Sequence, residues 1–108
     1  MPDIVVKDAS GRALRLWDFR QKTHVTLIYD PAASAESRRA LEADIAAREK
    51  TWTWLALKIF VVSEMPAEFP AGVYLIDRYA HLANVVTDLS NLWEKIEKEY
   101  IYLEARQC

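Results

Sequence analysis

The side chains of this sequence that could take part in chemistry are few. Cys108 is the single cysteine and the last residue, so an intramolecular disulfide and a dithiol enzyme are excluded, and a cysteine metal site would need other residue types or other chains. Ser34 and Ser37 could act as a pair of nucleophiles. Ser34, however, lies just before Glu36 and a helical pattern, which is typical of a helix N-cap. We therefore predict that these serines cap a helix.

The histidines and two aspartates are the other candidates. His24 and His81 could ligate a metal or act as a base, but they flank different predicted strands and have no carboxylate or cysteine at a recognisable spacing. We predict a structural or surface role for both. Asp30 and Asp77 end strands on the side where α/β folds bind ligands. Aspartate is also a turn former, and we favour that interpretation here.

The elements that must position these residues are strands and helices in alternation. β-branched and aromatic runs bounded by turn residues predict strands, and apolar residues at helical spacing predict helices. The predicted strands cover 3–6, 13–16, 24–30, 57–62, 73–76 and 81–86, and the predicted helices cover 34–55 and a segment that follows Asp88 as its N-cap. The alternation of threonine and tryptophan over 51–54 also permits a strand there. The prolines within 65–72 exclude a helix between the fourth and fifth strands.

This order predicts one α/β domain spanning residues 1–108. The central strand, helix and strand require a parallel pair with a right-handed crossover, and the hairpin over 73–86 adds an antiparallel edge. In the last helix a stripe of apolar residues must pack on the sheet. The stripe consists of Leu89, Leu92, Trp93, Ile96, Tyr100 and Leu103.

Composition excludes several classes of partner. The 14 basic and 16 acidic residues give a net charge of −2 with no basic run, so we expect no binding to nucleic acid. The longest apolar runs, such as 59–62, are far shorter than the roughly 20 residues that span a bilayer, so we expect no membrane segment. Residues 1–7 lack the apolar core of a secretion signal, and we expect a cytoplasmic protein. Nothing in the composition indicates a cofactor.

Two motifs resemble those of a known family. The segment 8–20 has the pattern D-x-x-G-x-x-x-x-L-x-D-F-R, and residues 75–78 read L-I-D-R. Both are similar, in order and spacing, to segments of the peroxiredoxin group (AhpC/TSA and redoxin proteins) of the thioredoxin-like superfamily. The resemblance covers residues 3–104. It implies a thioredoxin-like three-layer fold in which a mixed sheet with an N-terminal β-hairpin carries packed helices.

The resemblance also locates a redox site that has lost its cysteines. Family members place a reactive cysteine in the loop and first helical turn after the central strand, where a helix N-terminus favours thiolate. By the thioredoxin C-x-x-C pattern, Ser34 and Ser37 occupy the cysteine positions, and by the peroxiredoxin pattern Arg38 does. Serine cannot cycle through a disulfide or a sulfenic acid. Pro70 is the candidate for the cis-proline that the family places ahead of the next strand.

Four tryptophans are many for so small a core. We predict that Trp93 is buried in the helical stripe, whereas Trp17, Trp52 and Trp54 include surface anchors for a protein partner or a homodimer.

The sequence thus favours a non-catalytic binding or structural module. The alternative is a thiol oxidoreductase that uses Cys108 or the cysteines of a partner. Cys108 itself could be an exposed thiol without function, a link between two chains, or the first of a cysteine pair that continues beyond this sequence. A third possibility is a small ligand bound near Asp30 and Pro70.

Overall fold

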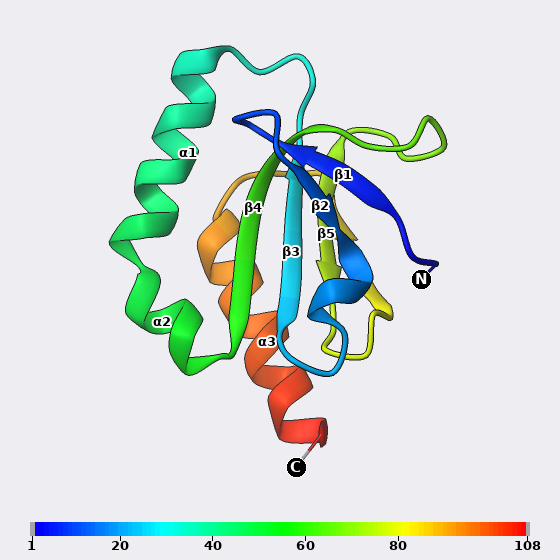
Figure 1. Cartoon of the computed structure of the whole chain (residues 1–108). Helices are drawn as coiled ribbons and strands as arrows, with labels where there is room; N and C mark the ends of the chain where they lie inside the picture. The colour runs from blue at the N-terminus through cyan, green and yellow to red at the C-terminus, as the bar shows by residue number, and fades with distance from the viewer. Residues whose placement is uncertain (1, 108) are drawn as a thin grey trace.

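The computed structural model describes residues 2–107 and has the predicted order of strands and helices (Figure 1). The strands are β1 (Val5–Asp8), β2 (Ala13–Arg15), β3 (His24–Tyr29), β4 (Leu57–Glu64), β5 (Gly72–Ile76) and β6 (Leu82–Val86). The helices are α1 (Ala35–Ala47), α2 (Glu49–Trp54) and α3 (Leu92–Gln107), with a 3-10 turn, η1, at Leu16–Phe19. The expected N-terminal hairpin is β1 and β2, which pair antiparallel.

The six strands form one mixed sheet in the order β2-β1-β4-β3-β5-β6. The central pair, β3 and β4, is parallel, with His24 opposite Leu57 and Tyr29 opposite Val62, and the chain between them forms the crossover helices α1 and α2. The flanking pairs, including the β5–β6 hairpin, are antiparallel. The predicted mixed sheet with a parallel centre is therefore confirmed.

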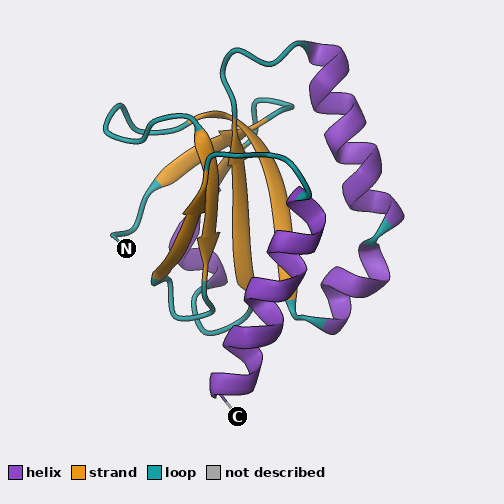
Figure 2. Ribbon diagram, turned by 180° about the vertical axis from the view of Figure 1, so that it is seen from behind, coloured by secondary structure: helices purple, strands orange, loops and turns teal. Residues whose placement is uncertain are grey.

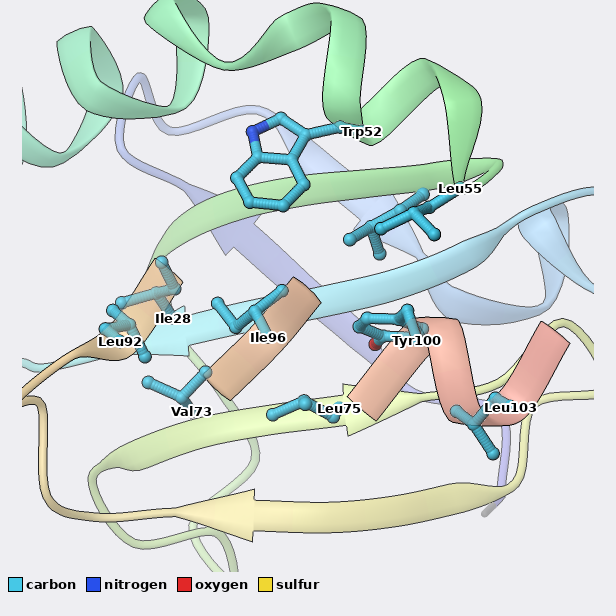
Figure 3. Close-up of a cluster of buried hydrophobic side chains, with 10 residues drawn as sticks. Ile28, Trp52, Leu55, Val73, Leu75, Leu92, Ile96, Tyr100 and Leu103 are labelled. Atoms are coloured by element: carbon cyan, nitrogen blue, oxygen red, sulfur yellow. The ribbon is translucent and has the colours of Figure 1, made fainter. Parts of the chain in front are cut away.

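The sheet has a core on each face. Seen from behind, α3 lies across one face of the sheet with α2 beside it (Figure 2). The buried residues of this helix-side core, shown in Figure 3, are Ile28, Trp52, Leu55, Leu57, Val73, Leu75, Leu92, Ile96, Tyr100 and Leu103. The chain crosses from β4 to β5 through 65–71 without a helix, and this segment, with Met65 and Phe69, covers the other face together with the N-terminal hairpin and η1. The buried residues of that hairpin-side core are Ile4, Val6, Leu16, Val25, Leu27, Val62, Tyr74 and Ile76.

The long helix predicted over 34–55 is two helices that meet at Arg48. The backbone of Arg48 (φ −111°, ψ 19°) leaves the helical region, so α2 starts in a new direction. This turn buries Trp52, which is 4% exposed and donates its indole N–H to the carbonyl oxygen of Ile45 at 3.1 Å. The possible strand over 51–54 is wrong, because these residues belong to α2.

The C-terminal helix starts later than predicted. It begins at Leu92, and Asp88 instead accepts a hydrogen bond from the main-chain N–H of Ser90 at 3.0 Å, which closes a turn ahead of the helix. Leu89 therefore lies outside the helix and is 45% exposed, so its place in the stripe is wrong. The remaining stripe packs on the sheet as predicted, with Trp93 partly buried against the helix-side core.

Candidate functional site

The positions where the family would carry cysteines lie in a closed helix start. After β3, the carboxylate of Asp30 accepts from the N–H of Ala32 at 3.2 Å and forms the predicted turn. Ser34 has an extended backbone (φ −72°, ψ 162°), and its Oγ accepts from the N–H of Ser37 at 3.1 Å. The two hydroxyl oxygens are 3.1 Å apart and share a hydrogen bond. The predicted N-cap is confirmed, and both hydroxyls are used to hold the start of α1.

Nothing bonded to these serines activates them as nucleophiles. Within residues 2–107 their hydroxyls bond only to each other and to the main chain, and no histidine or carboxylate accepts from either. Arg38, at the other candidate cysteine position, donates its main-chain N–H to the Ser34 carbonyl at 3.0 Å and is partly buried. A serine without a base to take its proton is a weak nucleophile.

Pro70 does not have the form expected of it. Among the described residues no peptide bond is cis, so the bond before Pro70 is trans. Its carbonyl oxygen accepts a hydrogen bond from the Tyr74 hydroxyl. The cavity nearest the expected site has a volume of about 150 Å³ and lies between the end of β3 (residues 28–30), residues 71–73 and the side chains of Thr87 and Leu89. Small-molecule pockets usually span about 300 to 1,000 Å³, so this space is small for a ligand.

A second group of polar side chains lies at the opposite end of β3. His24 is fully buried, and its Nε2 lies 2.6 Å from the Oε1 of Glu104 on α3. Arg78, which follows β5, donates to the same carboxylate oxygen. The ring of His24 also packs against Tyr100 with 5.1 Å between centroids. His24 therefore has a carboxylate partner that sequence spacing could not indicate, because Glu104 is 80 residues away.

The environment of His24 favours the neutral imidazole. Burial lowers its pKa more than the hydrogen bond to Glu104 and the charge of that carboxylate raise it. The guanidinium of Arg78 already compensates the charge of Glu104, whose pKa is lowered because the bonds from His24 and Arg78 outweigh the effect of burial. The Nδ1 of His24 has no partner in the described chain, so protonating it would leave a buried N–H unsatisfied. His24 thus lies in the core, paired with Glu104, and not on the surface.

The second histidine and Asp77 form a turn at the surface. The carboxylate of Asp77 accepts from the N–H groups of Tyr79 and His81, each at 2.9 Å, which confirms its predicted role as a turn former. The His81 ring is exposed, with its Nδ1 3.7 Å from Asp77. In the part of the chain that the structure describes, no three histidine, cysteine, aspartate or glutamate side chains come together to hold a metal ion.

The tryptophans divide between core and surface. Trp17 and Trp54 are 43% and 74% exposed, and the guanidinium of Arg20 lies 4.9 Å from the centre of the Trp17 ring. Trp52 is buried, so its assignment as a surface anchor is wrong: the break at Arg48 turns it into the helix-side core. The predictions for Cys108 concern a residue outside the described range.

The comparisons with known proteins agree on the fold. No protein-family model and no curated protein sequence matches the chain. It is similar to the solution structure of an uncharacterized thioredoxin-like protein from Bacteroides vulgatus, with a TM-score of 0.62 and 15% identity over 97% of this chain and 89% of the other. It is also similar to the crystal structure of a conserved protein of unknown function from Bacteroides fragilis, with a TM-score of 0.50 and 14% identity over 88% and 94% of the two chains.

No helix within residues 2–107 is long and apolar enough to cross a membrane. Together with the sheet order and the packed helices, the comparisons show that this chain has a thioredoxin-like α/β fold.

Proposed function

We propose that this chain is a non-catalytic thioredoxin-like domain that acts by binding another protein. The observation that carries the proposal is the start of α1, where Ser34 and Ser37 replace the family's thiols and are bonded to each other and to the helix. Thiol exchange and peroxide reduction both need a thiolate, and a hydroxyl engaged as a helix cap supplies none. The cavity near this helix start, with about 150 Å³, is also small for a substrate.

We also propose that the domain derives from the peroxiredoxin group, because the residues that carry the resemblance have structural roles. Asp8 of the first motif accepts from the N–H groups of Ser10 and Arg12, each at 2.9 Å, and Gly11 takes the positive φ of 89° that closes the turn. Asp77 of the second motif closes the turn between β5 and β6. A domain that kept its scaffold and lost its nucleophile would keep these residues.

The exposed aromatic side chains support binding to a protein in the cytoplasm, either another copy of the chain or a different partner. Trp54, at the end of α2, leaves most of its indole in water, and Trp17 lies on the surface of η1. Burying such rings is a large source of affinity at interfaces, where tryptophan is enriched among the residues that matter most.

The test is a turnover assay on the full chain. We expect no reduction of hydrogen peroxide and no catalysed disulfide exchange with dithiothreitol as the reductant, both for the wild type and for a Cys108→Ser variant. Turnover that the wild type shows and Cys108→Ser lacks would replace this proposal with a thiol oxidoreductase that uses Cys108. A Ser34→Ala variant is the matched control at the expected site, and it too should leave the background rate unchanged.

A further inference from the structure

One cavity of the described chain lies away from the expected redox site. It has a volume of about 480 Å³, within the usual range of ligand sites, and runs between the crossover helices and β4. Its walls come from residues 42–53 of α1 and α2, from residues 57–61 of β4, and from Asp8 and Ser10 of the first hairpin turn. We call it the β4 groove.

The β4 groove lies against the first part of β4, which has no paired strand on one side although β4 is inside the sheet order. Successive side chains of a strand point to opposite faces, so a cavity over one face would be lined by alternate residues. All of residues 57–61 line this one, which places it beside the strand. Within residues 2–107 the only strand that neighbours β4 on this side is β1, which pairs at Val62 and Glu64 and then turns away. Both views show α1 beside the outer edge of β4 (Figures 1 and 2).

Two hydrogen bonds show which main-chain groups face the groove. The N–H of Ala9 donates to the carbonyl of Val61 at 3.0 Å, so the main-chain groups of Val61 point toward the β1 side. The N–H of His24 donates to the carbonyl of Ala56 at 2.8 Å, so those of Ala56 point toward β3. Because main-chain groups alternate along a strand, the N–H and C=O of Ile59 point into the groove. They offer an added strand one donor and one acceptor.

The helical wall of the groove is under-packed for a crossover helix. None of the residues of α1 is buried, and its apolar residues Leu41 and Ile45 are only partly covered. A partner chain lying between α1 and β4 would cover the side chains of Ile45 and Ile59, which both line the groove. Hydrophobic burial would therefore add to the main-chain hydrogen bonds.

The charge of the lining identifies the kind of partner. Glu42, Glu49 and Asp8 supply three carboxylates against the single ammonium of Lys58. Within residues 2–107, neither Glu42 nor Glu49 forms an ion pair, whereas Asp8 lies 3.7 Å from Arg12. Lysine and arginine side chains have an apolar stem and a cationic head, so they can pack along Ile45 while reaching Glu42 or Glu49. An acidic peptide would meet repulsion in the same place.

We infer that the β4 groove binds an extended peptide segment with alternating basic and apolar residues, which adds to the sheet as a strand beside β4. The inference rests on the proposed function and names the partner class for a binding domain of this fold. Strand addition of this kind takes its affinity from main-chain bonds and its specificity from alternate side chains.

The experiment titrates the isotope-labelled full chain with an acetylated Lys-Val-Lys-Val-Lys-Val peptide and follows each main-chain amide by nuclear magnetic resonance. We expect shifts concentrated at residues 57–61 and hydrogen exchange of the Ile59 amide slowed at least tenfold at saturation. A Glu-Val-Glu-Val-Glu-Val peptide of the same length is the control ligand. It should bind at least tenfold more weakly.

Matched charge reversals test the groove itself. Glu42→Lys and Glu49→Lys should each weaken the affinity for the basic peptide by about two- to fivefold, the range for exposed ion pairs. Glu68→Lys on the 65–71 loop should leave the affinity for this peptide unchanged. The inference would be overturned by the absence of shifts at millimolar peptide or by shifts centred on β6. It would equally be overturned if both peptides bound with the same affinity, or if Glu42→Lys and Glu68→Lys had equal effects. None of these results bears on the turnover assay, so the two proposals fail separately.

Discussion

The hydroxyl of Tyr100 joins two strands of the sheet from the helix that covers them. It donates to the carbonyl of Val25 on β3 at 2.7 Å and accepts from the N–H of Ile76 on β5 at 3.0 Å. It also accepts from the hydroxyl of Thr26 at 2.9 Å. The side chain reaches from α3 toward the sheet within the helix-side core (Figure 3). One proton and two lone pairs are thus all used.

A Tyr100→Phe substitution keeps the ring in place and removes these three bonds, together with the longer contact of the hydroxyl proton with the carbonyl of Ile76 at 3.2 Å. A buried hydrogen bond contributes about 0.5 to 1.5 kcal/mol, and a buried group left without a partner costs about 1 to 3 kcal/mol. Thr26 and Tyr100 are both 0% exposed, so water does not replace the lost oxygen. We expect the free energy of unfolding to fall by about 3 kcal/mol. At about 4 to 8 °C per kcal/mol for a domain near this size, the midpoint of thermal unfolding falls by about 12 to 24 °C.

Urea unfolding followed by circular dichroism measures the change, with the free energy extrapolated to water. The matched control is Tyr79→Phe, since Tyr79 is 44% exposed and should change stability by less than about 0.5 kcal/mol. A loss below about 1 kcal/mol for Tyr100→Phe would refute this account. It would mean that Val25 and Ile76, which are opposite each other in the register, bond directly once the hydroxyl is gone.

Three other predictions concern His24, the start of α1 and the edge strand β6. Burial lowers the pKa of His24, so the unfolded chain binds a proton at this histidine more readily than the folded chain does. The free energy of unfolding should therefore fall as the pH drops below about 6.5. His24→Gln should make this pH dependence weaker in urea unfolding from pH 5 to 8, and substitution of the exposed histidine should not. In a Cys108→Ser background, the thiol of Ser34→Cys should have a pKa below about 8.5, because it lies at a helix N-terminus. The pH dependence of its alkylation measures this pKa, and an unperturbed or raised value would contradict the prediction. On the edge strand β6, the side chain of Asn84 accepts a hydrogen bond from the N–H of Val85 at 2.8 Å. Asn84→Val should free this donor and increase self-association, measured by sedimentation. Unchanged sedimentation would show that this bond does not protect the edge.

Features that depend on neighbouring residues were predictable from the sequence. The β-branched run 24–29 predicts β3, and Ser34 before a helical pattern predicts the cap, because strand preference and capping are both local. The turns at Asp8 and Asp77 follow from the same short-range chemistry. These signals together give the order of elements, and the order of elements limits the topology.

Features that depend on distant contacts were not predictable. The break at Arg48 has no proline or glycine to mark it, and it is stabilised by burial of Trp52, which a helical pattern alone does not reveal. Leu89 has the spacing of the buried stripe but precedes the helix, because Asp88 closes a turn with Ser90. The contact of His24 with Glu104 joins the first residue of β3 to the last helix.

The same contacts indicate where a partner of this domain would have to bind. At one end of β3 the carboxylate of Glu104 is already bonded to His24 and Arg78, and at the other end Ser34 closes the start of α1. Helices cover one face of the sheet, and the hairpin with η1 covers the other. The open hydrogen-bonding groups are therefore on the edge strands and on the part of β4 that β1 does not pair with. On β6 one donor is already taken by a side chain, whereas on β4 the groove leaves the main chain of Ile59 accessible, and this is the physical reason to look for a partner there.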